Sequence, residues 1–156
     1  MDETQQGKDN PGVIAPPPLI YLGGLIGGLL LDRIVPVVFV PGHPIAGAVL
    51  AGLGVILMAL GIREFKRTKT EYLPYKPTAR IISSGPFRFT RNPLYLSMSL
   101  IYAGLAIAFG SVWSLVLFIP VLATIRYGVI GREERYLERK FGAEYLGYKN
   151  SVRRWI

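Results

Sequence analysis

The chain has 156 residues, of which 51% are hydrophobic, with a mean hydropathy of +0.36 and a formal net charge of +8. The absence of cysteine excludes disulfides, thiolate catalysis and cysteine metal sites, and the one histidine, His43, cannot build a zinc site alone, so we expect no metal. Basic clusters directly flank long apolar blocks, so the positive charge indicates contacts with anionic lipids rather than with nucleic acid. We therefore expect an all-α integral membrane protein with about four transmembrane helices.

The first half of the chain contains two of these apolar blocks. Residues 1–12 are polar and are expected to form a flexible tail, which leaves 13–156 as a single transmembrane domain. The first membrane helix is expected to start near Pro18. Small residues repeat along it at a spacing that lets another helix approach closely. These residues are Gly23, Gly24, Gly27 and Gly28. The second block, Ile45–Ile62, is uncharged and ends in a basic run at the membrane interface.

A basic, turn-rich run, SSGPFRFTRNPLY over Ser83–Tyr95, leads into the second half. Pro93 suits the first position of a helix, and Asn92 before it is expected to cap that helix. The start of the helix would then direct unpaired N–H groups and a partial positive charge toward Arg88 and Arg91. The sequence therefore predicts a binding site for an anion at this position.

Residues 93–125 carry no charge, and they are too long for one span but sufficient for two short ones. With a turn at Gly110, they predict a tight C-terminal helical hairpin formed by Pro93–Phe109 and Val112–Ile130. The last helix is expected to run past the bilayer as a helical extension and to stop at Gly142. The tyrosines and arginines that follow suit a segment at the level of the lipid headgroups.

Basic residues also predict the orientation in the membrane. Of the 18 Lys and Arg residues, 8 lie in 63–91 and 8 in 126–156. Four spans place both clusters on the same side, which the positive-inside rule makes the cytoplasmic side. Both termini are therefore expected in the cytoplasm, which for a prokaryote means a protein of the inner membrane.

Glu133 and Glu134 are candidate site residues on the last helix. Adjacent side chains on a helix point about 100° apart, so the two carboxylates cannot face one partner equally. Glu133 has no cation four residues away, so either it belongs to a solvated charged face or it needs a partner outside the helix. In the second interpretation, one ligand with both a carboxylate and cationic or hydroxyl groups would satisfy Glu133 and the anion site together.

The segment GPFRFTRNPLYLS, followed about forty residues later by REERYLERKFGAEYLGYK, resembles the C-terminal half of the isoprenylcysteine carboxyl methyltransferase and phospholipid methyltransferase families. The resemblance covers 79–156, half of the chain. Its elements are a Gly-Pro-aromatic turn at 85–87, Arg-Asn-Pro-x-Tyr at 91–95, the glutamate pair, Phe-Gly at 141–142 and two tyrosines at 145 and 148.

The resemblance implies a membrane methyltransferase that uses S-adenosylmethionine and methylates a lipophilic or small acceptor, with 79–156 as the cofactor-binding half. It assigns no catalytic residue. It implies that the cofactor is bound by Ala79, Arg80, Ile81, Ile82, Phe87, Arg91, Asn92, Pro93, Tyr95, Glu133 and Glu134. Prenylcysteine enzymes place a substrate-binding arginine one turn before the first glutamate, where this chain has Val129. Two alternatives follow: Arg126 or Arg132 substitutes for that arginine, or the substrate is not a prenylcysteine carboxylate.

Two other functions stay open at this point. The same membrane half resembles sterol reductases, which use NADPH. A small helical scaffold with polybasic lipid contacts is the non-enzymatic alternative, and it would bind no nucleotide cofactor.

Overall fold

The computed structural model describes residues 11–36, 41–70 and 78–155. Most of the tail expected at 1–12, namely 1–10, lies outside the described residues, as does 71–77. The described residues form the α-helices α1 (Pro17–Ile34), α2 (Pro44–Arg67), α3 (Pro93–Phe109), α4 (Val112–Thr124), α5 (Gly131–Phe141) and α6 (Ala143–Ser151). A 3-10 helix, η2 (Gly85–Arg88), precedes α3, and a π-helix, η3 (Ile125–Ile130), joins α4 to α5. The prediction of an all-α fold is confirmed.

Three helical rods in the described residues are long and apolar enough to cross a membrane: α1, α2, and the continuous run of α4, η3 and α5. The apolar helix α3 has 17 residues, which is the lower limit for a span. These helices indicate an integral membrane protein. The predicted hairpin is confirmed with the expected bounds, and Gly110 forms its turn with a φ of 64°, a conformation that glycine adopts without steric cost.

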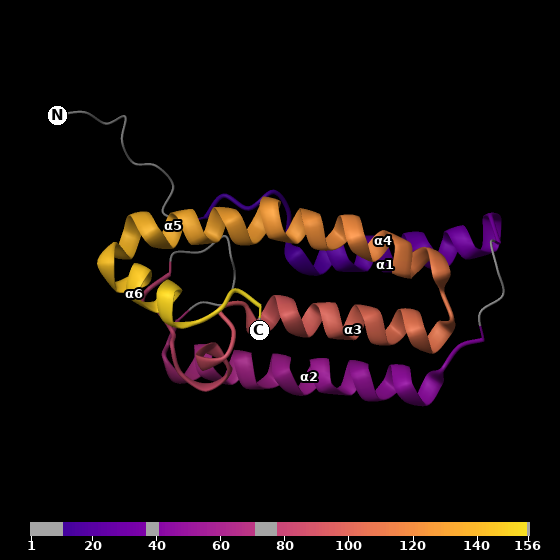
Figure 1. The fold of residues 1–156 in the computed structure, drawn as a ribbon, viewed down its shortest axis with the longest axis horizontal. Coiled ribbons are helices and arrows are strands. Elements are labelled where there is room, and N and C mark those ends of the chain that lie inside the picture. Colours follow the sequence, from indigo (N-terminus) through magenta and orange to yellow (C-terminus); the bar gives the residue numbers. More distant parts are fainter. Residues whose placement is uncertain (1–10, 37–40, 71–77, 156) are drawn as a thin grey trace.

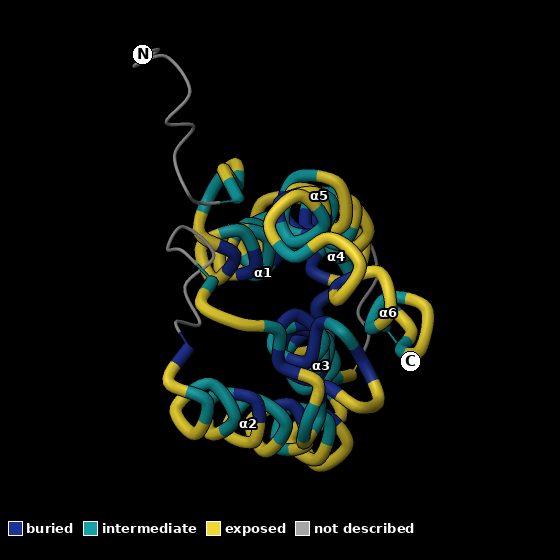
Figure 2. The backbone as a smooth tube through the Cα atoms, turned by 90° about the vertical axis from the view of Figure 1, so that its left-hand side faces the viewer, coloured by how far each residue is buried: buried dark blue, intermediate teal, exposed yellow. Residues whose placement is uncertain are grey.

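The helices pair in two layers (Figures 1 and 2), with α1 beside α4 and α2 beside α3. Glycines permit both pairings. A Cβ on Gly28 would lie 2.4 Å from the Ser114 backbone, and one on Gly47 would lie 2.4 Å from the Gly104 carbonyl oxygen. The predicted packing role therefore applies to Gly28 and to Gly24, where a Cβ would lie 2.5 Å from the Val121 side chain. A Cβ on Gly23 would meet nothing within 4 Å among the described residues.

The turn of the hairpin is held by a polar cluster, which we call the hairpin end. The side chain of Asp32, near the end of α1, accepts hydrogen bonds from the Ser111 hydroxyl and from the Trp113 backbone N–H. The Ser111 hydroxyl in turn accepts from the Ser114 N–H at 3.1 Å, which caps α4. Both carboxylate oxygens of Asp32 thus accept hydrogen bonds from the start of α4.

At the opposite end of the bundle, the C-terminal residues pack against the loop that precedes α3. The last helical rod continues to Phe141 as predicted, and Gly142, with a φ of 52°, ends it and turns the chain into α6. The residues after α6 fold back onto the loop before α3 rather than lying apart from the bundle. The backbone N–H of Arg91 donates to the backbone carbonyl of Arg153 at 3.0 Å. Tyr145 of α6 is accordingly buried, with 2% of its surface exposed.

Candidate functional site

A cavity of about 120 Å³ lies between the loop that precedes α3 and helices α5 and α6. We call it the Arg91 cavity. Its walls are mixed: apolar side chains from the loop and from η2 face two carboxylates of α5 and two tyrosines of α6. The described residues that line it are Pro11, Phe65, Thr78, Arg80, Ile81, Ile82, Phe87, Arg91, Asn92, Glu133, Glu134, Tyr136, Leu137, Tyr145 and Tyr148.

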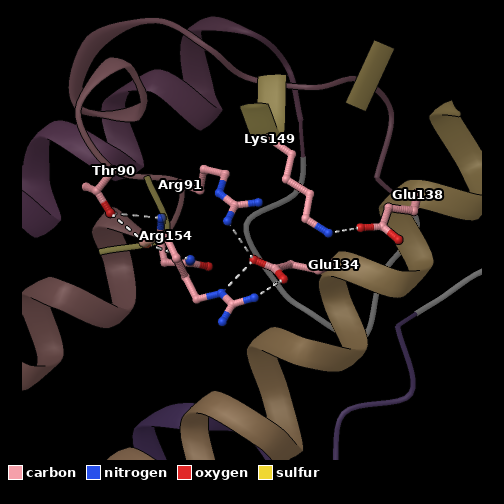
Figure 3. A network of polar contacts seen from close by, with 7 residues as sticks. Thr90, Arg91, Glu134, Glu138, Lys149 and Arg154 are labelled. Atoms are coloured by element: carbon pink, nitrogen blue, oxygen red, sulfur yellow. Dashed lines mark hydrogen bonds and ion pairs between the residues drawn. The ribbon is translucent and has the colours of Figure 1, made fainter. Parts of the chain in front are cut away.

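A buried ion-pair cluster borders the cavity (Figure 3). The Glu134 carboxylate accepts two hydrogen bonds from the Arg154 guanidinium, at 2.9 Å from Nε and 2.7 Å from Nη2. Arg91 Nη2 lies 3.4 Å from Oε1 of the same carboxylate. A two-pronged arginine–carboxylate pair of this kind fixes both partners firmly. Glu134 is therefore a buried structural anion held between two cations, one of which, Arg91, borders the cavity.

Arg91 is not fully paired by this arrangement. Its side chain is only 9% exposed. Its Nε and Nη1 atoms are buried without a hydrogen-bond partner among the described residues. Buried polar groups normally find a partner, because leaving a charged one unpaired is costly. Two cationic nitrogens without a partner beside a cavity are the arrangement that a bound anion would complete.

Asn92 holds the loop in place, but not as the sequence predicts. It occupies the capping position before α3, yet its side chain accepts no hydrogen bond from the helix, so that part of the prediction is wrong. Its Nδ2 instead donates to the Arg154 carbonyl at 2.9 Å, and the Thr90 hydroxyl donates to the same carbonyl at 3.1 Å. The Asn92 side chain therefore contacts the returning chain through its NH2 group, and the loop is fastened from outside the helix.

Tyr95 and Glu133 form a second polar contact, between α3 and α5. The Tyr95 hydroxyl donates to Glu133 Oε1 at 2.7 Å. Both residues line a smaller cavity of about 80 Å³, which we call the Tyr95 cavity. It adjoins the first, because Phe87, Arg91 and Glu133 line both. The two adjacent glutamates thus take different partners. Glu133 has its partner outside its own helix, which is the second of the two interpretations given for it from the sequence.

The Gly-Pro-aromatic turn forms the 3-10 helix η2 and delivers one aromatic ring to the site. Phe87 is buried and meets Phe65 of α2 edge to face, with ring centroids 5.4 Å apart. The Tyr148 hydroxyl donates to the Phe87 carbonyl at 2.8 Å. Gly85 adopts a φ of 57°, and a Cβ there would lie 2.7 Å from the Glu64 side chain, so glycine is required at this position.

An apolar groove lies beside the Tyr95 cavity, between α1 and α2 and over α3. We call it the lateral groove; its volume is about 420 Å³. Its walls are almost wholly apolar and include Tyr21 of α1, Met58 of α2 and Met98 of α3. Leu94 and Tyr95 line both this groove and the Tyr95 cavity. The two spaces therefore meet at the side chain whose hydroxyl contacts Glu133.

The structure brings most of the predicted cofactor-binding residues together. Arg80, Ile81, Ile82, Phe87, Arg91, Asn92, Glu133 and Glu134 line the Arg91 cavity, and Pro93 and Tyr95 line the Tyr95 cavity. Ala79 is exposed and lines neither.

The two predicted substrate-binding arginines lie elsewhere. Arg126 is exposed, with its guanidinium 5.5 Å from the centre of the Tyr127 ring. Arg132 is also exposed, and its Nη1 donates to the Gly12 carbonyl at 2.8 Å. Neither arginine lines the Arg91 cavity, the Tyr95 cavity or the lateral groove.

The residues of the site that were not predicted include Tyr145, Tyr148 and Arg154. The two tyrosines stand in the Tyr-x-x-Tyr element noted in the sequence, which was the available signal for them. Burial raises the pKa of Tyr145 to about 12, so its hydroxyl stays protonated beside Arg91 at neutral pH. Nothing in the sequence indicates that Arg154 pairs with Glu134. No group of three potential metal ligands occurs in the part of the chain that the structure describes.

Comparisons with known proteins identify the family of the chain. A family model described as phospholipid methyltransferase matches residues 43–144, more than half of the chain. A Haemophilus influenzae protein described as uncharacterized is 41% identical over 63 residues, which are 40% of this chain and all of that protein. No solved structure matches the chain.

Proposed function

The chain belongs to the phospholipid methyltransferase family, and from that premise we propose an integral membrane enzyme that transfers a methyl group from S-adenosylmethionine to an apolar or lipid-like acceptor. The observation that carries the proposal is Arg91. Its buried Nε and Nη1 have no hydrogen-bond partner among the described residues, beside a cavity that Glu133 and Glu134 also line. A ligand with a carboxylate next to an ammonium group would complement both kinds of charge.

The residues present fit the cofactor. Arg91 would bind its carboxylate, since charge-assisted bonds to arginine are the strongest available here. Glu133 gives one oxygen to the Tyr95 hydroxyl, which leaves Oε2 to accept from an ammonium or ribose hydroxyl group. Apolar walls formed by Ile82 and Phe87, both buried, would contact the adenine.

When bound, S-adenosylmethionine supplies an electrophilic methyl group: the acceptor forms a bond to that carbon as the carbon–sulfur bond breaks, and S-adenosylhomocysteine leaves with the electron pair on sulfur. The chain contributes position and a dry environment. Phe65 and Phe87 exclude water from one side of the Tyr95 cavity. Tyr95, held by Glu133, forms the boundary between this cavity and the lateral groove.

The acceptor would lie in the lateral groove. Its apolar walls suit a hydrocarbon chain drawn from the bilayer, and the groove reaches the site at Leu94 and Tyr95. A carboxylate acceptor would need no general base, whereas an amine or thiol must lose its proton. Because the positive-inside rule places both basic clusters in the cytoplasm, we propose that the cofactor enters from that side.

Thermal unfolding of the protein in detergent tests the proposal. S-Adenosylhomocysteine is expected to raise the midpoint, because a ligand that binds only the folded state adds about 2.7 kcal/mol of stability at a hundredfold excess over Kd. NADPH is expected to leave the midpoint unchanged. A shift with NADPH alone would support the reductase alternative. No shift with millimolar S-adenosylhomocysteine would contradict the methyltransferase.

A further inference from the structure

The outer face of α2 carries an apolar stripe that ends in a cation. Its exposed side chains follow one another at spacings of three and four residues, which is one face of a helix. They are Val49, Leu53, Ile56 and Leu60, each at least 44% exposed. The next position on this face is Arg63, which is also exposed. An acyl chain lying along the stripe would therefore place its headgroup beside Arg63.

A groove of about 430 Å³ begins where this stripe ends, and we call it the outer groove. One wall is α2, with Leu57, Leu60 and Arg63; the other is η2 and the residue after it, with Arg88 and Phe89. Leucines at one end and an arginine from each wall at the other give the groove an apolar half and a cationic half. Among the described residues, none that lines this groove also lines the Arg91 cavity, the Tyr95 cavity or the lateral groove.

The charge in the outer groove is not neutralised by the acid beside it. Glu64 also lines the groove, but its Oε2 accepts hydrogen bonds from Arg67 Nε and the Ser84 hydroxyl, both at 2.9 Å. No ion pair joins a carboxylate to Arg63 or Arg88 among the described residues. The two arginines thus present a net positive charge to whatever occupies the groove.

Phe89 supports the same placement at the membrane surface. Its side chain is large and apolar, yet it is 75% exposed, directly after Arg88. Aromatic and arginine side chains together are typical of the headgroup region, where the ring enters the apolar boundary and the guanidinium meets phosphate. An exposed phenylalanine here is accounted for when the turn touches lipid.

We propose that the outer groove binds one anionic glycerophospholipid. Arg63 and Arg88 hold its phosphate, and one acyl chain lies along Leu57 and Leu60. Arginine suits this task because its planar guanidinium forms directed hydrogen bonds to phosphate oxygens. The turn Gly85–Arg88 would then contact lipid through Arg88 on its outer side, while on its inner side it holds Phe87 in the Arg91 cavity.

The test measures thermal unfolding of the full chain in neutral detergent micelles that contain phosphatidylglycerol or, at the same mole fraction, phosphatidylcholine. Phosphatidylglycerol is expected to raise the midpoint more. Arg63→Gln/Arg88→Gln is expected to weaken its apparent affinity on the order of tenfold and to abolish the difference between the two lipids. Arg63→Lys/Arg88→Lys should keep most of the effect, which separates loss of charge from damage to the fold.

The matched control is Lys66→Gln/Lys69→Gln, which removes two exposed charges from the same end of α2 but outside the groove. It is expected to retain the response to phosphatidylglycerol. An equal loss in both glutamine double variants would show a diffuse polybasic attraction and overturn the site. Full retention in Arg63→Gln/Arg88→Gln would also overturn it, as would equal stabilisation by inorganic phosphate. None of these outcomes depends on S-adenosylhomocysteine.

Discussion

The buried polar groups at the two ends of the bundle differ in how completely they are hydrogen-bonded. At the hairpin end, both oxygens of Asp32 accept hydrogen bonds, from the Ser111 hydroxyl and the Trp113 N–H. At the site end, which borders the Arg91 cavity, the Glu134 carboxylate is equally well satisfied by Arg154, but two nitrogens of Arg91 have no partner among the described residues. One cluster is complete without a ligand and the other is not.

This difference separates stability from binding. A satisfied buried polar group stabilises the fold modestly, whereas an unsatisfied one costs roughly 1–3 kcal/mol. Within the described residues, the buried side-chain atoms without a partner both belong to Arg91. The hairpin end is therefore expected to respond to mutation through stability alone, and the site end through ligand affinity.

The largest expected effect is that of Arg91→Ala on the response to S-adenosylhomocysteine. The variant removes both unpaired nitrogens while Glu134 keeps Arg154, so the fold is retained and ligand affinity falls roughly 100-fold. The midpoint shift on ligand addition measures it. Arg88→Ala removes an exposed arginine three residues earlier and should respond like wild type. Equal behaviour of the two variants would remove Arg91 from the site.

Arg154→Ala tests whether the site end also depends on its own internal pairing. Glu134 loses its two-pronged partner, and because Arg154 is partly exposed we expect a loss of about 2 kcal/mol in the free energy of unfolding rather than the full cost of a buried pair. Unfolding without ligand measures it. Arg153→Ala, an exposed neighbour whose backbone carbonyl makes the contact, should be nearly neutral.

Glu133→Gln is expected to weaken S-adenosylhomocysteine binding about tenfold with little change in stability. Glutamine can still accept from the Tyr95 hydroxyl, so the contact between α3 and α5 persists while the negative charge is lost. A ligand titration followed by thermal unfolding gives the affinity, with exposed Glu144→Gln as the control. A wild-type affinity would mean that Glu133 supports Tyr95 only.

The smallest expected effect is at the hairpin end. Asp32→Asn keeps one acceptor for the Trp113 N–H but weakens the bond from Ser111, so we expect a loss of about 1 kcal/mol in stability. The affinity for S-adenosylhomocysteine should not change. A change in affinity would show that the two ends are coupled, and it would contradict the assignment of stability to the hairpin end and ligand affinity to the site end.

The sequence predicts the hairpin to the residue because its signals are local. A charge-free run, a glycine in a turn and a proline at the first helical position suffice to place α3 and the start of α4. Most residues of the Arg91 cavity are also predicted, since the family pattern lies within two short segments. The path of α2 against α3 is not predicted, because it depends on Gly47 and Gly104, which no local signal pairs.

The parts that the sequence misses are contacts between distant segments. Asn92 looks like a helix cap by composition, but in the folded chain its side-chain NH2 group donates to the Arg154 carbonyl and its side chain makes no capping hydrogen bond. Arg154 itself stands in a basic run that resembles any interfacial segment. Its pairing with Glu134 follows only from the fold-back after α6. The residues of the π-helix η3 likewise carry no local pattern that predicts a π-helix rather than a continuous α-helix.

The fastening of the loop before α3 also has a consequence for how the protein is made. The side chains of Asn92 and Thr90 are held by a carbonyl 62 and 64 residues further along the chain. Synthesis must therefore pass residue 154 before the loop can be secured, when all of α2 and α3 has already been made. A nascent chain stopped short of that point is expected to enter the membrane and pair its helices, yet to lack the ability to hold its ligand.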